Sequence, residues 1–178
     1  MSDRSGQACA LMVMTPIEAG KEGELRAYLE SLPQRGSPLE RLERTHFARW
    51  VIVDDFVSEP EQPHEDHLSR PYLIFTSNFD GPTDSYLDEL CDRLAPEAAE
   101  IWGRCAGCPA GAAGAELKRY LLDNRVRTGF FVAAYGQATA AKVKAALELR
   151  VRMIDLAERS EPMSPAQLRA AFDAEIGA

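Results

Sequence analysis

The hydrophobic and polar positions of the chain follow two periods, and these predict strands and helices in a regular order. Residues 8–14 are an unbroken apolar run, which is typical of a buried strand. Residues 45–56 and 72–78 have the two-residue alternation of strands. A further apolar run at 128–135 predicts a fourth strand.

Apolar residues three and four positions apart predict helices between and after these strands. The first stripe covers residues 25–32 and ends at Pro33, and its helix begins either at the capping box of residues 15–18 or after Gly20. The later helices are expected after Pro82 with an interruption at Pro96 and an end near Arg104, over 116–123, from Thr139 to about Glu158, and from Ser164-Pro165 to near Ile176.

The resulting order is β-α-β-β-α-β with trailing helices, which predicts an α+β fold with a ferredoxin-like antiparallel sheet. We expect a single domain over 1–178, with a core at about 8–140 and C-terminal helices over 138–178. Helices in such a fold cover one face of the sheet and leave the other face open. Pairing two sheets in a homodimer is the economical way to cover it.

Alternation along the strands separates the two faces of this sheet. Within 72–79 one set of residues is mainly leucine and phenylalanine and is expected to lie beneath the helices. The other set is predicted to form a pocket or a dimer contact, and it comprises Tyr72, Ile74, Thr76 and Asn78. The same alternation assigns His46 to the face of Ala48 and Trp50.

Charge and targeting signals narrow the classes of function. The net charge is −8 at pH 7, which disfavours a nucleic-acid backbone as a partner. No run approaches the roughly 18 apolar residues of a membrane span, and residues 1–7 lack the apolar core of a signal peptide. We therefore expect a cytoplasmic protein without membrane or nucleic-acid partners, whose cysteines stay reduced.

Two segments carry a resemblance to a known superfamily: Ser37-Pro38 with Thr45-His46-Phe47-Ala48-Arg49-Trp50, and Ser77-Asn78-Phe79-Asp80-Gly81. With these segments, the strand–helix–strand order and residues 20–25 at the first helix, the chain resembles the dimeric α/β-barrel superfamily over about 8–140. The HFARW and SNFDG segments look like a signature of mostly uncharacterised bacterial members. That superfamily includes cofactor-independent monooxygenases, cyclases and haem relatives, so the resemblance implies a homodimer acting on small molecules, with oxidoreductase chemistry among the possibilities.

The second segment is also similar to the Gly-x-x-Asp-Gly motif of dye-decolorising peroxidases, in which the aspartate lies over haem. The first glycine of that motif is absent here. Those enzymes ligate iron with a later histidine, whereas no histidine follows His67 in this chain. In a haem-binding alternative, His46 would have to replace that ligand.

Four polar side chains at strand positions are the candidate catalytic residues: His46, Arg49, Asn78 and Asp80. Histidine titrates near neutral pH, so His46 could be a general acid or base, or it could simply bond a backbone group. Asn78 could orient a carbonyl group or bond a turn. Asp80 could support this network, or it could cap the helix that follows.

Arg49 has a functional and a structural interpretation. Its planar guanidinium could hold a carboxylate or a developing enolate. Equally, it could pair with one of three acidic neighbours, Asp54, Asp55 or Asp80.

Four further residues are candidate substrate-binding groups: Trp50, Tyr72, Thr76 and Tyr135. Aromatic side chains on strands either line an apolar pocket or serve ordinary packing.

Other clusters carry weaker signals. Cys105 and Cys108 form one CxxC, whereas a zinc site needs two more ligands at suitable spacing. His64 and His67 lie among acidic residues in the proline-containing connection, which is more typical of a hydrated loop, so we expect no metal. The Glu59–Asp66 part of this connection has a length that permits a lid.

The leading hypothesis is a small-molecule enzyme that uses cofactor-independent acid–base chemistry. It would oxygenate, cyclise or isomerise an apolar or aromatic metabolite. No phosphate-binding glycine loop, Gly-x-Ser-x-Gly or HExxH motif points to nucleotide or classical hydrolytic chemistry. A haem-binding peroxidase-like protein and a non-catalytic binding or assembly module are the alternatives.

Overall fold

The computed structural model describes residues 3–57, 61 and 63–177. It divides the chain into two compact units, Met1–Gln137 and Ala138–Ala178. The boundary falls where the sequence predicted the C-terminal helices to begin. None of the helices in the described part of the chain combines the length and apolar character needed to cross a membrane.

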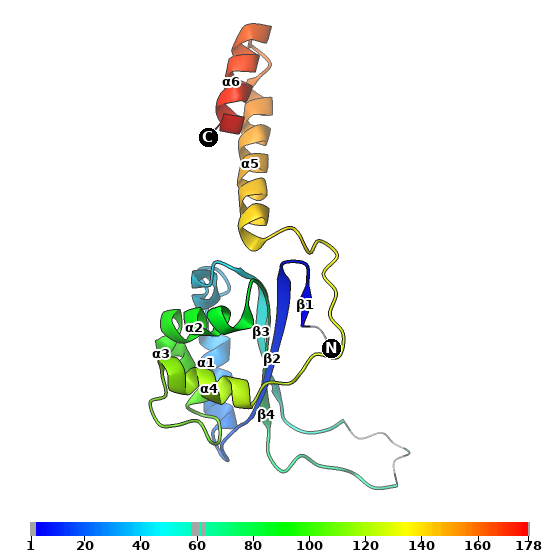
Figure 1. The fold of residues 1–178 in the computed structure, drawn as a ribbon, viewed down its shortest axis with the longest axis vertical. Coiled ribbons are helices and arrows are strands. Elements are labelled where there is room, and N and C mark those ends of the chain that lie inside the picture. The colour runs from blue at the N-terminus through cyan, green and yellow to red at the C-terminus, as the bar shows by residue number, and fades with distance from the viewer. Residues whose placement is uncertain (1–2, 58–60, 62, 178) are drawn as a thin grey trace. The chain divides into compact units, whose positions relative to one another are not determined.

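A four-stranded antiparallel sheet forms the first unit's centre, in the order β1-β2-β4-β3 (Figure 1). Its strands are β1 (Arg4–Ser5), β2 (Ala8–Pro16), β3 (Thr45–Val53) and β4 (Tyr72–Asp80). The predicted α+β class is thus confirmed, as are the first three predicted strands. The arrangement is compatible with a ferredoxin-like fold.

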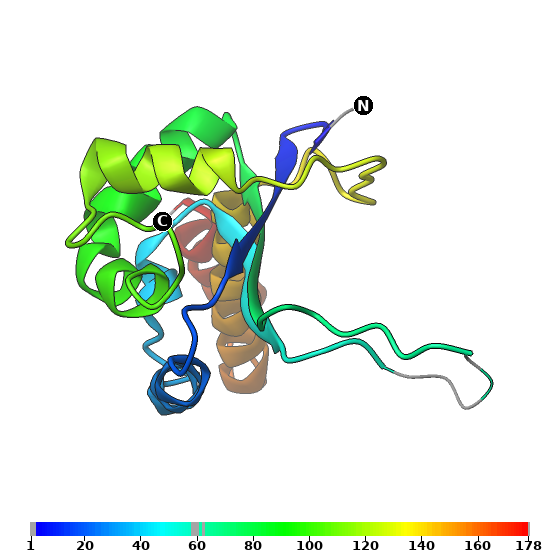
Figure 2. The same cartoon turned by 90° about the horizontal axis from the view of Figure 1, so that it is seen from below.

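The α-helices of the first unit cover one face of this sheet (Figure 2). They are α1 (Glu22–Ser31), α2 (Thr83–Arg93), α3 (Ala95–Trp102) and α4 (Gly114–Asp123), and a 3-10 helix, η1, spans Pro38–Arg41. The capping-box alternative for α1 is wrong, because Thr15 and Pro16 belong to β2. Pro96 lies in the first turn of α3, where its missing N–H costs nothing, and α2 and α3 are separate helices as predicted.

The second unit consists of α5 (Ala140–Arg159) and α6 (Pro165–Gly177). The predicted cap of α5 is confirmed, since the Thr139 hydroxyl accepts a hydrogen bond from the Lys142 backbone N–H. The helix α6 begins at Pro165, again as predicted.

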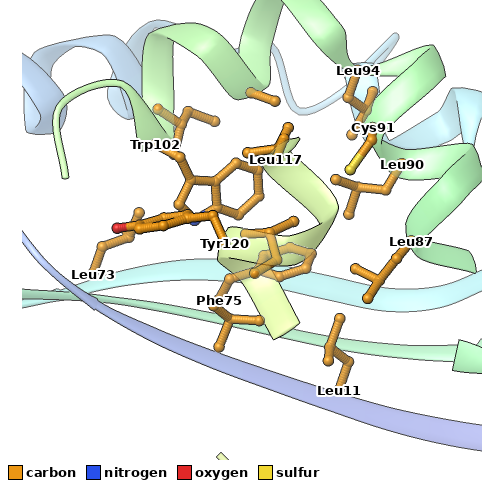
Figure 3. Packing of buried hydrophobic residues seen from close by; sticks show 14 of the residues in the cluster. Leu11, Leu73, Phe75, Leu87, Leu90, Cys91, Leu94, Trp102, Leu117 and Tyr120 are labelled. Carbon is orange, nitrogen blue, oxygen red and sulfur yellow. The ribbon is translucent and has the colours of Figure 1, made fainter. Parts of the chain in front are cut away.

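The core lies between the sheet and α1–α4 (Figure 3). Leu73, Phe75 and Phe79 are fully buried, which confirms the predicted helix-facing side of β4. The same alternation places Ser77 on the helix-facing side of β4. The Ser77 hydroxyl lies 2.6 Å from the buried Tyr86 hydroxyl. That hydrogen bond explains how a polar residue is accommodated within the apolar set.

The predicted strand at 128–135 is wrong, because these residues form no strand. Residues 124–126 instead follow the edge of β2: the Met14 N–H donates to the Asn124 carbonyl, and the Val126 N–H donates to the Met12 carbonyl. At the start of β2 the same edge is paired with β1, through Ala8 and Cys9. The short N-terminal hairpin therefore occupies part of the edge that a full fourth strand would need.

Candidate functional site

The sheet face away from α1–α4 combines apolar and polar side chains in rows across the three long strands. One row consists of Ala10, Asn78 and Phe47, and the next consists of Met12, Thr76 and Arg49. A third row, Met14, Ile74 and Val51, is entirely apolar. Phe47 is 76% exposed although it is a large apolar residue.

A hollow of about 550 Å³ lies over the first two rows. Met12 and Phe47 give it apolar borders, while Arg49, Thr76 and Asn78 contribute polar groups. The chain beyond α4 also reaches the hollow through Thr128. Apolar borders with a few converging polar groups are typical of small-molecule sites.

Arg49 makes none of the ion pairs that its structural interpretation required. Asp54 pairs with Arg26 at 2.8 Å, and the other two aspartates pair with histidines. Within the described ranges Arg49 has no ion pair, and its Nε donates to the Thr76 hydroxyl at 3.2 Å. One edge of the guanidinium is thus positioned by the sheet, and its charge is not neutralised by a described carboxylate.

Asn78, in the neighbouring row, is a second polar side chain on the open face whose hydrogen-bonding groups are available to a ligand. It is half-buried on β4, and its amide makes no hydrogen bond to any residue that the structure describes. A half-buried amide normally finds a partner. Together, Arg49 and Asn78 present N–H donors suited to a carboxylate or enolate oxygen of a bound molecule.

His46 and Asp80 form a pair beside this hollow. The His46 Nε2 lies 2.9 Å from Asp80 Oδ1, and both side chains are largely covered. The register of β3 shifts between Thr45 and Phe47, so His46 is the extra residue of a β-bulge. Bulges re-aim side chains, which explains why simple alternation assigned His46 to the face of Trp50.

Asp80 does not serve as the helix cap that was considered for it. The helix α2 begins at Thr83, and its N-cap residue is Pro82, which makes no side-chain capping bond. Asp80 is instead 8% exposed and engaged with His46. The carboxylate therefore holds the histidine ring in a fixed orientation.

The remaining predicted site residues divide between the hollow and other locations. Thr76 lines the hollow, whereas Trp50 packs with Phe75 and Trp102 in the core, with ring centroids 5.3 and 6.4 Å away. Tyr72 lies on the open face four residues from Thr76, or about 13 Å along the strand. Tyr135 is 84% exposed in the connection between α4 and α5.

The CxxC sequence lies against the core. Cys105 is 1% exposed, its thiol accepts a hydrogen bond from the Thr15 hydroxyl, and burial raises the pKa of the Cys105 thiol to about 11. Burial also raises the pKa of Cys108. These thiols remain protonated at neutral pH and are therefore poor nucleophiles.

The histidines of the acidic connection form no metal site in the described residues, where no group of three or more potential ligands converges. His67 Nδ1 lies 2.7 Å from Asp55 Oδ2. Asp55 also accepts hydrogen bonds from the backbone N–H groups of Leu68 and Phe56. Of the segment considered as a lid, Glu59, Pro60 and Gln62 lie outside the described residues.

Asp55 should titrate far below an ordinary aspartate. The Leu68 N–H, His67 and the Phe56 N–H stabilise its ionised form and lower the pKa of Asp55 to about 2. These bonds should be intact above about pH 4 and be lost as the pH falls towards 2. In an NMR titration, we expect the Leu68 and Phe56 amide signals to move with a midpoint near pH 2. A midpoint near pH 4 for both amides would contradict this.

Two parts of the site were not predicted from the sequence. Met12 borders the hollow because it lies opposite Thr76 on the open face. Alternation along β2 would have predicted this position if the pairing of β2 with β4 had been known. Thr128 was assigned to a strand, and no local signal indicated that it would reach the open face. Comparisons with protein-family models, with curated proteins and with solved structures found no match.

Proposed function

We propose that the hollow on the open face binds a small, largely apolar or aromatic metabolite through a carboxylate or enolisable carbonyl oxygen. The chain would be a cofactor-independent acid–base enzyme that oxygenates, cyclises or isomerises this metabolite. The observation that carries the proposal is Arg49, held by Thr76 at the hollow without a described acidic partner. An arginine at an apolar hollow favours a bound anion.

In the proposed chemistry, one pair of residues stabilises the ligand oxygen and a second pair transfers a proton. Arg49 and Asn78 would stabilise negative charge that develops on the ligand oxygen. His46 would take and return a proton, while Asp80 fixes its ring. Asn78 and Asp80 are two residues apart on β4, or about 7 Å. A single small aromatic molecule can span that distance, with its oxygen at Asn78 and its reacting carbon towards His46.

A second copy of the chain would complete the site as a homodimer. The open face exposes three large apolar residues: Phe47 in the first row, and Met14 and Val51 in the third row. Exposed apolar patches of this kind mark interaction surfaces. Covering them with the same face of a second sheet would also exclude water from the hollow, as the dimeric α/β-barrel resemblance implies.

Replacing Arg49 by glutamine should weaken binding of aromatic carboxylates by about 10- to 100-fold, because a charged hydrogen bond contributes about 1.5–3 kcal/mol. Isothermal titration calorimetry with benzoate, phenylacetate and aromatic 3-oxo acids measures this. Arg26→Gln is the matched control, since Arg26 pairs with exposed Asp54. Equal affinities of wild type and Arg49→Gln, or no binding by any member of the panel, would overturn the proposal.

No observation specifically favours the haem alternative. Asp80 engages His46 Nε2, which leaves Nδ1 as the free ring nitrogen for either iron or a proton. We therefore assign no step to haem. An absorption spectrum between 300 and 700 nm, taken on protein from cells supplied with iron and a haem precursor, distinguishes the two ideas. A band near 400 nm that disappears in His46→Ala would favour haem over the acid–base proposal.

A further inference from the structure

A second hollow, also of about 550 Å³, meets the hollow over the sheet at Thr128, which borders both. The other described residues that border the second hollow are Asp3, Leu122, Arg125 and Arg127. Two arginines at one hollow are notable in a chain whose net charge is −8. The second hollow therefore concentrates positive charge directly beside the proposed binding site.

Asp3 fixes the chain where it passes between the two hollows. Its Oδ2 accepts a hydrogen bond from the Arg125 guanidinium, and its Oδ1 accepts one from the Thr128 backbone N–H at 3.1 Å. The Asp3 and Arg125 side chains are 27% and 23% exposed, so this ion pair is partly shielded from water. Thr128 is thus held at the border of both hollows by a residue distant in the sequence.

Arg127 differs from Arg125 because no carboxylate of the described residues neutralises it. It is exposed at the border of the second hollow, and it makes no ion pair or side-chain hydrogen bond within the described ranges. Both carboxylate oxygens of Asp3 are already engaged by other groups. A guanidinium is always charged at neutral pH, and its geometry suits carboxylate and phosphate oxygens. Arg127 is therefore available to an anionic group of a bound molecule.

The strand pairing indicates how far Arg127 lies from Arg49. Arg49 lies opposite Thr76, and Thr76 lies opposite Met12. The Met12 carbonyl accepts a hydrogen bond from the Val126 N–H, so the residue before Arg127 continues this row beyond β2. Three strand spacings separate the backbones of Arg49 and Val126, which is about 14 Å. A ligand that reaches both guanidinium groups must therefore be elongated.

We propose that the ligand of the open face carries a second anionic group, a carboxylate or a phosphate, which Arg127 binds in the second hollow. This inference rests on the proposed function, in which Arg49 holds the first anionic group. The ligand is then an elongated dianion, and its apolar part lies over Met12 and Thr128, which border the first hollow. Two arginines at a fixed separation select against ligands with a single charge and against dianions that are too short.

Calorimetric titration of the full chain with 4-(ω-carboxyalkyl)benzoates of increasing chain length tests this. Each diacid is compared with its methyl ester at the alkyl end, which keeps the length and removes one charge. At the matching length, we expect the diacid to bind about tenfold more tightly than its ester, because it gains a charged hydrogen bond at an exposed arginine. A second series that ends in an alkyl phosphate shows which anionic group is bound. An advantage over the ester for either group, lost in Arg127→Gln, supports the proposal.

Three variants separate this inference from the proposed function. Arg127→Gln should weaken only the dianions, whereas Arg49→Gln should weaken the dianions and their esters alike. Arg119→Gln is the matched control, because Arg119 is also exposed but is not among the described residues that border either hollow.

The outcomes of these titrations are distinct. If dianions and esters bind equally at every length, and both depend on Arg49, the second anionic site is wrong and the proposed function stands. If no benzoate of either series binds, the proposed function itself is wrong. An equal loss of dianion affinity in Arg119→Gln and Arg127→Gln would reflect the total charge of the protein and would also overturn the second site.

Discussion

Replacing His46 by glutamine is expected to lower turnover by two to four orders of magnitude and leave ligand affinity nearly unchanged. A positioned general acid or base typically contributes that much to a reaction rate. Glutamine retains hydrogen bonding to Asp80 but cannot take up a proton at neutral pH. The binding groups Arg49 and Asn78 remain in place, so the loss should appear in the rate constant and not in the dissociation constant.

Exchange of carbon-bound hydrogen in D2O measures this without knowledge of the natural product. Aromatic 3-oxo acids that bind in the calorimetric panel are followed by proton NMR with wild type and variant. His67→Gln is the matched control, because His67 pairs with Asp55 in the connection and not with the site. Wild-type exchange rates in His46→Gln would remove His46 from the mechanism. A loss shared equally by His67→Gln would point to a general effect on folding.

Replacing Trp102 by alanine should cost about 3–5 kcal/mol of unfolding free energy, the usual range for a buried large aromatic. Trp102 is 1% exposed, and its ring packs edge-on against Phe75, with the ring centroids 5.5 Å apart (Figure 3). The Trp50 ring centroid lies 6.4 Å from that of Trp102. The Trp102 indole N–H has no hydrogen-bond partner in the described residues, so the loss comes from packing. Such a cost is a large share of the stability of a typical domain.

Chemical denaturation followed by circular dichroism measures the Trp102 effect. Trp102→Phe keeps an aromatic ring and removes the unpartnered N–H, so it should cost clearly less than the alanine variant. Phe130→Ala is a surface control, because Phe130 is 84% exposed and does not border the hollow. A cost below about 1 kcal/mol for Trp102→Ala would show that this cluster does not hold the sheet and the helices together.

The helix-facing side of the sheet could be predicted because periodicity reports burial directly. Leu73 and Phe75 belong to the alternating leucine and phenylalanine set of β4, and both are fully buried as expected. The strand at 128–135 could not be judged in this way. Its residues are apolar enough for a strand, but the edge of β2 that it needs is partly paired with β1, and Arg4–Ser5 is too short for a recognisable strand pattern. A local sequence pattern cannot predict which of two distant segments pairs with the edge of a strand.

The candidate site was predicted in composition but not in geometry. The polar residues at strand positions were the signal for Arg49, Asn78, His46 and Asp80, and the structure pairs His46 with Asp80 and Arg49 with Thr76. Alternation failed at His46, because a bulge adds one residue to β3 and shifts the phase. It grouped Trp50 with Ala48 on one face of the strand, but it did not say which face the helices cover, and residue type alone could not decide between core packing and a pocket.

Chemical-shift mapping on the full chain tests the central claim most directly. The methionine methyl groups are natural reporters: Met12 borders the hollow, whereas Met153 and Met163 belong to the second unit. During titration with the tightest aromatic carboxylate of the panel, we expect the Met12 methyl and the Thr76 and Asn78 amide signals to shift together and saturate. Shifts confined to other residues, with Met12, Thr76 and Asn78 unmoved while ligand binds, would contradict a binding site on the open face of the sheet.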